Sequence, residues 1–314
     1  MKNENMTGLE LGKEEKTIHT IENMYQAYYP LLFSIGYRMT GSVMDTEDLI
    51  QDTIFKAIQS VEWKVIENKQ AYLCKMLSRR CLDYLKSATK QRETYIGEWL
   101  PEPILYNESN DFPEQKLEEK ESIGFAYLHM LEKLTATERV VFLLREVFQH
   151  EYQEIADVVN KSEVNCRKVY SRAKAKLHNI ERDPLIDHRQ NQQLIHQFIS
   201  ALNSGDEIKL SQLLADDVVI YSDGGGKVMA ATRPINNLSR VLPFLLGIVR
   251  KTRDYTYEIK VINGQPGVLF FRDEQLVSVC QYTWINQQIK QLHFLLNPDK
   301  LRYIATQLET SKFI

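Results

Sequence analysis

Residues 134–177 read LTATERVVFLLREVFQHEYQEIADVVNKSEVNCRKVYSRAKAKL, and this stretch decides the fold class of the middle of the chain. Apolar residues at helical spacing predict a short helix over Tyr152–Val159. Asn160 and Lys161 then favour a tight turn, and Ser162 is a good N-cap for a second helix from Glu163 to Leu177. Two short helices joined in this way form a helix-turn-helix, a motif that often binds DNA.

The second of these helices is basic on one side. Residues 161–180 contain six lysines and arginines and one acid. We expect the inward face to comprise Val164, Val169, Ala173 and Leu177. We expect the outward face to comprise Asn165, Arg167, Lys168, Ser171, Arg172 and Lys174. Such side chains donate to phosphates and to base edges, and Glu163 can accept from cytosine. The alternative is an ordinary solvated basic helix of a bundle.

Residues 18–96 are predicted to form a helical domain, because glycine and proline are sparse and apolar residues recur every three or four positions. The acids of Asp45–Asp48 open a helix where its dipole favours negative charge. Its expected buried side comprises Leu49, Ile50, Ile54, Phe55 and Ile58. A further helix is expected over Lys69–Ala88. Residues 97–117 contain three prolines and many polar side chains, which predicts a linker, and a second helical domain then covers 118–182.

Residues 74–92 combine cations with aromatic rings. The segment holds six lysines and arginines and one acid, Asp83, and Tyr84 and Tyr95 lie in it or beside it. Cations follow the backbone of single-stranded DNA while rings stack on unpaired bases, so this composition suits a melted duplex. An amphipathic helix with aromatic residues in its core explains the same composition equally well.

From residue 185 to residue 314 the pattern is that of an α+β domain. Helices over about Asn191–Asn203, Glu207–Leu214 and Ile235–Val249 accompany segments in which apolar residues alternate. The expected strands are Asp217–Ser222, Thr256–Asn263, Val268–Arg272, Gln275–Ile285 and Lys290–Leu296. Asn263-Gly264 and Asp273-Glu274 predict tight hairpin turns. We expect a curved antiparallel sheet with helices packed on it.

The bulk composition restricts the class of protein. With 314 residues and a net charge of −3, the chain is not globally basic, which counts against indiscriminate binding of polyanions. No stretch approaches the ~18 apolar residues of a membrane helix, and the polar N-terminus has no signal core. We therefore expect a soluble cytoplasmic protein without membrane contact. Because Cys74, Cys81, Cys166 and Cys280 form no CxxC pair, we expect isolated reduced cysteines in packed positions and no metal site.

Taken together, the helical blocks resemble the extracytoplasmic-function (ECF) class of sigma factors. DTEDLIQDTIFKA (45–57) and AYLCKMLSRRCLDYLKSA (71–88) resemble the second conserved region of the class. ERVVFLLREVFQHEYQEIA (138–156) and SEVNCRKVYSRAKAKL (162–177) resemble its fourth region. WLPEP (99–103), DGGGK (223–227) and NPDKL (297–301) resemble three motifs of a subgroup with a C-terminal SnoaL-like domain. The resemblance implies two all-α sigma domains, a helical bundle and a helix-turn-helix, followed by a cone-shaped α+β domain.

The resemblance also implies that the chain binds core RNA polymerase and directs it to promoter DNA, without a cofactor or metal of its own. The helix 45–58 would bind the largest polymerase subunit through Asp48, Gln51, Asp52, Phe55 and Lys56. The segment 77–92 would hold the melted −10 element through Arg79, Arg80, Asp83, Lys86 and Arg92. Ser162, Glu163 and the six outward residues named above would read the −35 element. Lys86 stands where the class usually has arginine, so a bidentate base contact is not expected there.

For the tail, the subgroup implies regulation in cis through contact between the C-terminal domain and the sigma domains. The implied contact residues are Trp99, Pro101, Pro103, Asp223, Gly224, Gly225, Gly226, Lys227, Asn297, Pro298, Asp299 and Lys300. The alternative is an enzyme or a small-molecule sensor, with a pocket lined by Tyr221, Asp223, Tyr282, Trp284 and His293. No Ser/His/Asp order, HExxH motif or GxxxxGK[ST] motif supports catalysis, and no catalytic residue is predicted.

A conventional helix-turn-helix regulator with a small-molecule-sensing or enzymatic C-terminal domain is the main rival to the sigma assignment. Such a regulator does not need the acidic helix 45–58 or the basic and aromatic segment 74–92, and it usually dimerises on a palindrome. We instead predict a monomer when the chain is free.

Overall fold

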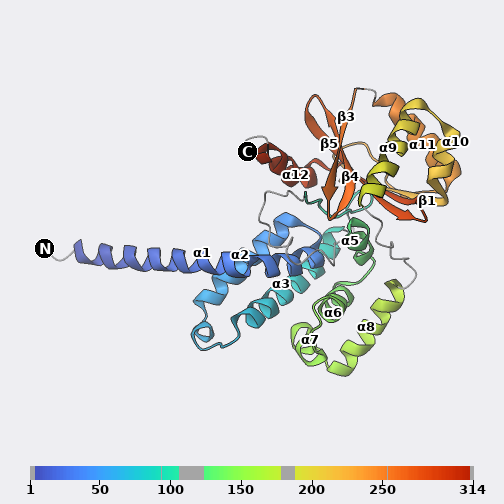
Figure 1. The fold of residues 1–314 in the computed structure, drawn as a ribbon. Coiled ribbons are helices and arrows are strands. Elements are labelled where there is room, and N and C mark those ends of the chain that lie inside the picture. The colour runs from blue at the N-terminus through green and yellow to red at the C-terminus, as the bar shows by residue number, and fades with distance from the viewer. Residues whose placement is uncertain (1–3, 93, 106–123, 178–187, 253, 312–314) are drawn as a thin grey trace. The chain divides into compact units, whose positions relative to one another are not determined.

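The computed structural model describes the backbone of residues 4–92, 94–105, 124–177, 188–252 and 254–311 (Figure 1). The side chains of residues 4–21, 64, 89–92, 188, 310 and 311 lie outside this description. The chain divides into two compact units. The first unit contains the helices up to residue 88 and those of residues 134–174, and the second contains residues 94–105 and 124–133 and the C-terminal part of the chain.

The first unit begins with three helices that account for the predicted N-terminal domain. They are α1 (Glu4–Thr40), α2 (Val43–Gln59) and α3 (Lys69–Arg92), with a short 3-10 helix η1 (Val61–Lys64) between the last two. The Ser42 hydroxyl caps α2 by accepting from the backbone N–H of Asp45 at 3.2 Å. The buried hydroxyls of Thr40 and Thr46 lie 2.8 Å apart, so these two polar groups at the α1–α2 corner form a hydrogen bond with each other.

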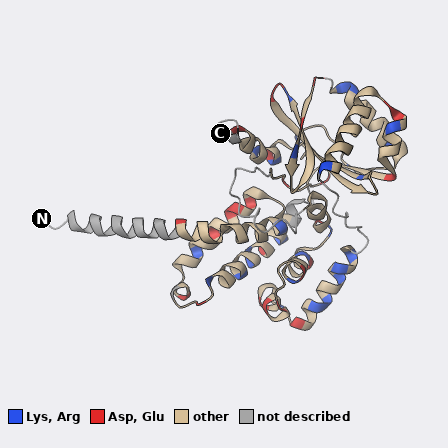
Figure 2. Cartoon of the chain, in the orientation of Figure 1, with Lys and Arg blue, Asp and Glu red and all other residues tan. Residues whose placement is uncertain are grey.

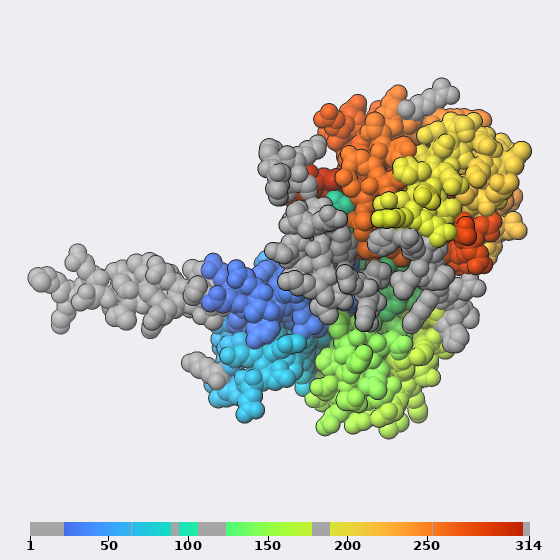
Figure 3. Space-filling view, in the orientation of Figure 1, coloured from blue at the N-terminus to red at the C-terminus, as the bar shows by residue number. Residues whose placement is uncertain are grey.

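Helices α6 (Ala136–Glu146), α7 (Tyr152–Val159) and α8 (Glu163–Leu177) complete the first unit. The bounds of α7 and α8 confirm the predicted helix-turn-helix. Asn160 ends α7 in the left-handed conformation, at φ 53°, and the Ser162 hydroxyl accepts from the N–H of Asn165. The buried Arg139 guanidinium of α6 donates to the Met39 carbonyl at 2.9 Å, which ties α6 to the end of α1. Figure 3 shows the surfaces of residues 41–88 and 134–174 side by side.

The second unit contains a six-stranded sheet in the order β2-β1-β6-β5-β4-β3. The strands are β1 (Leu214–Asp223), β2 (Ile235–Asn236), β3 (Thr256–Ile262), β4 (Gln265–Arg272), β5 (Gln275–Ile285) and β6 (Gln288–Leu295). The helices are α5 (Phe125–Leu131), α9 (His188–Ser204), α10 (Glu207–Leu213), α11 (Leu238–Lys251) and α12 (Pro298–Ser311). The predicted α+β domain is therefore confirmed, and α12 and β2 are elements that the sequence patterns did not predict.

One expectation about the sheet was wrong. β1 and β6 pair in parallel, with Tyr221 opposite His293, so the sheet is mixed rather than antiparallel. β6 leads into α12 at the end of β1 that carries the DGGGK motif, since Asp223 lies opposite Leu295. The predicted turns are confirmed, because Asn263, Gly264, Asp273 and Glu274 all have positive φ, as the tight turns of right-twisted hairpins require.

The two faces of this sheet are covered by different parts of the chain. Helices α9, α10 and α11 cover one face and enclose a core that includes Phe198, Tyr282 and Trp284. On the other face a second core joins residues of the sheet to Leu100, Phe125 and Leu301, which come from the segment 94–105, α5 and α12. Leu105 even forms an isolated β-bridge with Ile262 of the edge strand β3. The proline-rich segment 97–105, predicted as a linker, is thus packed into the second unit.

Candidate functional site

The α2 face consists of Asp48, Gln51, Asp52, Phe55 and Lys56. All five side chains are exposed, and their spacing places them along one side of the helix. Phe55 is 53% exposed, so its predicted place on the buried side of the helix was wrong. Ile50 and Ile54 are fully buried and fill that side without it. The exposed Phe55 ring therefore does not contribute to the core of this unit. An exposed aromatic ring among acids is typical of a protein-binding surface.

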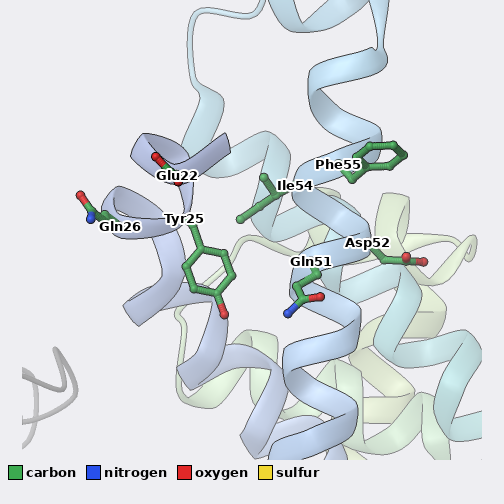
Figure 4. A pocket seen from close by; sticks show the side chains of 7 residues that line it. All are labelled: Glu22, Tyr25, Gln26, Gln51, Asp52, Ile54 and Phe55. Atoms are coloured by element: carbon green, nitrogen blue, oxygen red, sulfur yellow. The ribbon is translucent and has the colours of Figure 1, made fainter. Parts of the chain in front are cut away.

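A groove beside the α2 face extends the surface toward α1. Glu22, Tyr25 and Gln26 of α1 and Gln51, Asp52, Ile54 and Phe55 of α2 line it (Figure 4). The volume of the groove is about 570 Å³. Figure 4 shows the Phe55 ring at the side of the groove, projecting away from α1. Acids, amides and an exposed ring therefore border one continuous depression between the two helices.

The predicted −10 residues lie on α3, and the four whose side chains are described have partners. Arg79 donates to the Asp157 carbonyl of α7 at 2.8 Å, and Arg80 lies 3.1 Å from the Asp52 carboxylate of the α2 face. Asp83 and Lys86 are exposed and form a weak pair at 3.5 Å on the surface. Arg92 belongs to α3, but its side chain lies outside the described residues. Tyr84 donates to Asp45 at 2.6 Å, so its hydroxyl holds α3 to α2.

Helix α8 presents the predicted basic face. The outward residues named above are all exposed, and Figure 2 shows lysines and arginines along the helix. The inward face differs from the prediction, because Val164 is 64% exposed and Cys166 is fully buried in its place. Ala173 and Leu177 are buried as expected, and Val169 is half-buried. The inward stripe is thus shifted by two residues at the start of the helix, while the basic face keeps its predicted composition.

In the second unit, the carboxylate of Asp223 at the end of β1 collects hydrogen bonds from three separate segments. It is fully buried. Oδ1 accepts from the Tyr95 hydroxyl at 2.5 Å and from the Gly225 N–H at 3.0 Å. Oδ2 accepts from the Leu100 N–H at 2.9 Å and from Lys300 Nζ at 2.7 Å. We call Tyr95, Leu100, Asp223, Asn297 and Lys300 the Asp223 cluster.

Lys300 is the counter-charge of this cluster and is itself buried. Its ammonium group also donates to the Leu100 carbonyl at 2.5 Å and lies 3.8 Å from the centre of the Trp99 ring. A buried ion pair needs its remaining donors and acceptors satisfied, and here the backbone of the WLPEP motif satisfies them. The half-buried Trp99 ring adds a cation–π contact to this buried ammonium group.

The NPDKL motif begins α12 in a way that serves the same cluster. Asn297 acts as the N-cap, because its Oδ1 accepts from the Asp299 N–H at 3.1 Å, and proline follows at the first helical position. The Asn297 amide also donates to the Tyr95 hydroxyl at 2.9 Å. The capped first turn carries Lys300 to the Asp223 carboxylate and Asp299 to an ion pair with Lys227. The motif thus supplies the amide that bonds to Tyr95, the ammonium group that pairs with Asp223 and the carboxylate that pairs with Lys227.

Gly225 explains why the DGGGK loop contains glycine at its centre. Its φ is +59°, and a Cβ atom there would lie 2.3 Å from the Asn297 side chain. A side chain would therefore be strained by the backbone and would collide with the N-cap of α12. The loop can approach the cap closely only because the residue has no side chain.

A pair of buried histidines lies on the same face of the sheet. His129 Nδ1 of α5 is 3.2 Å from His293 Nε2 of β6, and the Tyr221 ring stacks on His293 at 5.2 Å. Burial, followed by the charges of Lys133 and Lys300, lowers the pKa of His129 to about 4. Burial also holds the pKa of His293 well below its ordinary value. Both rings are therefore neutral at pH 7, and one donates its single N–H to the other.

Comparison with known proteins identifies the two helical blocks. The family model of Sigma-70 region 2 matches residues 24–91, and that of Sigma-70 region 4 matches residues 125–177. The ECF RNA polymerase sigma factor SigJ of Mycobacterium tuberculosis is 30% identical over 295 residues, which cover 88% of this chain and 91% of SigJ. The chain belongs to the ECF sigma factors.

Two further comparisons cover nearly the whole sigma factor. The probable ECF sigma factor SigI of Mycobacterium tuberculosis is 26% identical over 291 residues, which cover 90% of this chain and 96% of SigI. The crystal structure of SigJ matches with a TM-score of 0.72 at 26% identity, covering 89% of this chain and 98% of that chain. The resemblance inferred from the sequence motifs is confirmed, including the SnoaL-like fold of the C-terminal domain.

The structure of this sigma factor separates the residues that the alternative reading placed in one pocket. Tyr282 and Trp284 belong to the core beneath α9–α11. Tyr221 and His293 lie on the opposite face, where their rings stack on each other, and the Asp223 carboxylate is occupied by the Asp223 cluster. The five side chains do not converge, so they do not line one cavity.

The sequence did not predict the contacts of several residues that join the sigma factor's C-terminal domain to the segments before it. Tyr95 was interpreted only as a ring for stacking on bases, and its hydroxyl belongs to the Asp223 cluster. His129 and Gln307 were not singled out, yet Gln307 accepts from the Leu105 N–H at 3.1 Å. No local pattern marks these residues, because their partners lie more than 100 residues away in the sequence.

All four cysteines are free and buried, as predicted. No described helix is long and apolar enough to cross a membrane.

Proposed function

We propose that this sigma factor binds core polymerase through the α2 face, holds the −10 element with α3 and reads the −35 element with α8. The proposal places it in the cytoplasm as a monomer until it binds core polymerase. The exposure of Phe55 supports the first assignment, since a large apolar ring at the surface is stabilised when a partner covers it. The exposed basic face of α8 and its place as the second helix of a helix-turn-helix support the last.

The experiment for the α2 face compares two exposed apolar residues of the first unit. Phe55→Ala removes the exposed ring, and Val61→Ala shortens an apolar side chain that is 86% exposed in η1, outside α2. We expect Phe55→Ala to weaken binding to core polymerase by about 30-fold, the effect of a hot-spot aromatic residue worth about 2 kcal/mol. Val61→Ala should bind like the wild type. Equal effects of the two substitutions would assign the core-binding role to another surface.

We further propose that the C-terminal domain regulates the sigma domains in cis and is not an enzyme. The observation that supports this is the Asp223 cluster, in which three motifs distant in sequence meet around one buried ion pair. The WLPEP motif lies between the two sigma regions in the chain, so whatever holds it influences how the regions can move apart. The polar groups are occupied by one another, which leaves none of them poised to act on a substrate.

Asp223→Asn tests the regulatory role, because it keeps the shape of the side chain and removes its charge. We expect it to loosen residues 95–105 and to change transcription by core polymerase from a cognate promoter. Asp217→Asn is the matched control, since Asp217 is a β1 acid whose pair with Lys290 is largely exposed. If Asp223→Asn loosens the segment and transcription is still that of the wild type, the cis role is excluded.

A further inference from the structure

Helix α5 belongs to sigma region 4 by sequence and to the second unit by structure. The region 4 match begins at residue 125, the first residue of α5, and continues through α8. In the structure, residues 124–133 pack with the SnoaL-like domain, while residues 134–174 lie in the first unit. The first helix of region 4 is therefore separated from the other three by a change of unit at residues 133 and 134.

The contact that holds α5 is small and specific. Phe125 enters the core shared by the sheet and α12, and its ring lies 5.6 Å from that of His293. The buried hydrogen bond between His129 and His293 is the polar centre of this contact, and the Tyr221 ring meets His129 edge-on at 4.6 Å. A helix of seven residues is not stable alone in water, so its conformation depends on what it packs against.

The sheet beneath α5 contains buried polar atoms that lack hydrogen-bond partners. Among the described residues, His293 Nδ1, Gln281 Oε1 and Thr283 Oγ1 are buried polar atoms without a hydrogen-bond partner. His293 pairs with Gln281 across the β5–β6 ladder, and Thr283 lies two residues farther along β5 on the same side. Buried polar atoms without partners cost free energy, so this interface is weaker than an apolar interface of the same size. Such a contact is suited to being broken and remade.

We propose that α5 is a detachable latch: docked on the SnoaL-like sheet through His129 and His293, it is withheld from region 4 and restrains transcription. Undocking returns the helix to region 4 and completes the fold that the family model spans. This inference rests on the proposed regulation in cis and names the segment through which it acts. The ligand of this face of the sheet is thus a segment of the chain itself.

A double-mutant cycle on the full chain tests the latch. His129→Leu or His293→Leu alone leaves one buried imidazole without a partner, and we expect amide exchange in residues 125–131 to accelerate about tenfold. Transcription by core polymerase should rise in both single variants. The double variant replaces both polar groups by apolar ones, so exchange and transcription should return toward wild-type values. His196→Leu, an exposed histidine of α9, is the control and should change neither.

Exchange of the β5 amides reports in the same samples that the sheet remains folded. If a leucine substitution also accelerates amide exchange in β5, Phe125→Ala provides a second test of the docking of α5, because it changes a residue of α5 and none of the sheet. Unchanged exchange in α5, or accelerated exchange without a rise in transcription, overturns the latch. If Asp223→Asn alters transcription while the histidine variants do not, the regulation in cis stands and the latch alone fails. If neither alters transcription, both fail.

Discussion

Each compact unit contains an ion pair that joins segments far apart in the sequence. In the first unit, Lys75 Nζ of α3 lies 2.8 Å from Asp157 Oδ2 of α7, and the side chains are 39% and 58% exposed. In the second, Lys300 Nζ lies 2.7 Å from Asp223 Oδ2, and the side chains are 7% and 0% exposed. The distances are alike, but water and salt screen only the first pair.

This difference separates a contact that opens easily from one that does not. Helices α3 and α7 belong to the parts that we propose to bind the −10 and −35 elements, which lie tens of ångströms apart along DNA at 3.4 Å per base pair. Helices in direct contact cannot reach both elements, so an exposed, easily broken pair is appropriate there. The Asp223 cluster instead holds the segment between the sigma regions in place, and a buried, fully bonded pair suits that role.

The largest effect is expected when the buried pair is broken from one side. Asp223→Ala leaves a buried ammonium group without its counter-charge, so we expect the second unit to lose about 3–5 kcal/mol of unfolding free energy. Urea denaturation, followed by amide exchange of the β-strands, measures this loss. Asp217→Ala, at the exposed pair with Lys290, should cost less than about 1 kcal/mol. Similar losses for the two variants would remove the distinction between the pairs.

Acid should weaken the second unit through its buried histidines. His129 has a folded-state pKa of about 4 against 6.5 for an unperturbed histidine, so the unfolded chain binds the proton first as the pH falls. Stability is therefore full above pH 6.5 and declines between pH 6.5 and 4, by about 3 kcal/mol for His129. Around His129, Lys133 and Lys300 oppose its protonation, and Glu98, 4.0 Å away and partly exposed, does not outweigh burial.

The acid effect is isolated by comparing the wild type with the double variant His129→Leu, His293→Leu at each pH. The carboxylates are common to both proteins, so the difference between their unfolding free energies reports the two histidines. We expect that difference to grow in favour of the variant from pH 6.5 downward. Parallel curves for the two proteins would contradict the buried, neutral state of the pair.

Gly225→Ala tests how closely the DGGGK loop must approach the α12 cap. The added Cβ collides with the Asn297 side chain, and the positive φ is strained for alanine, so we expect a loss of about 1–3 kcal/mol. Thermal unfolding of the second unit measures it. Gly205→Ala is a matched control, because this glycine also has a positive φ, of 69°, but a Cβ there meets nothing within 4 Å. The difference between the two variants reports the collision.

The smallest effect on stability is expected at the exposed pair. Asp157→Asn removes the charge opposite Lys75 and leaves the backbone carbonyl that binds Arg79, so the unfolding midpoint of the first unit should hardly move. The distance distribution between spin labels on Ala71 of α3 and Lys161 beside α7 should nevertheless broaden, as it should for the wild type in high salt. Asp83→Asn, within α3, is the control and should leave the distribution narrow.

Much of the local structure could be predicted from the sequence, because helices, caps and turns depend on residues a few positions apart. Tyr152–Val159 and Glu163–Leu177 are helices with the predicted bounds, and Asn263-Gly264 and Asp273-Glu274 turn as predicted. Periodicity alone failed where two apolar residues competed for one inward place. Cys166 is buried instead of Val164, and of the adjacent Ile54 and Phe55, both predicted to be buried, only Ile54 is. Which of two apolar residues is buried depends on where the neighbouring helices pack, and the sequence of the helix itself does not contain that information.

Contiguous residues suffice to identify this chain as a sigma factor with an added α+β domain, because the charge pattern, the helix-turn-helix and the motifs are local features. How the motifs contact one another follows from the tertiary fold. Asp223 meets Leu100 and Lys300 across 123 and 77 residues, and α5 leaves its own region for the SnoaL-like sheet. Such partnerships depend on which faces of the fold are buried together, and burial is a property of the whole chain rather than of any one segment.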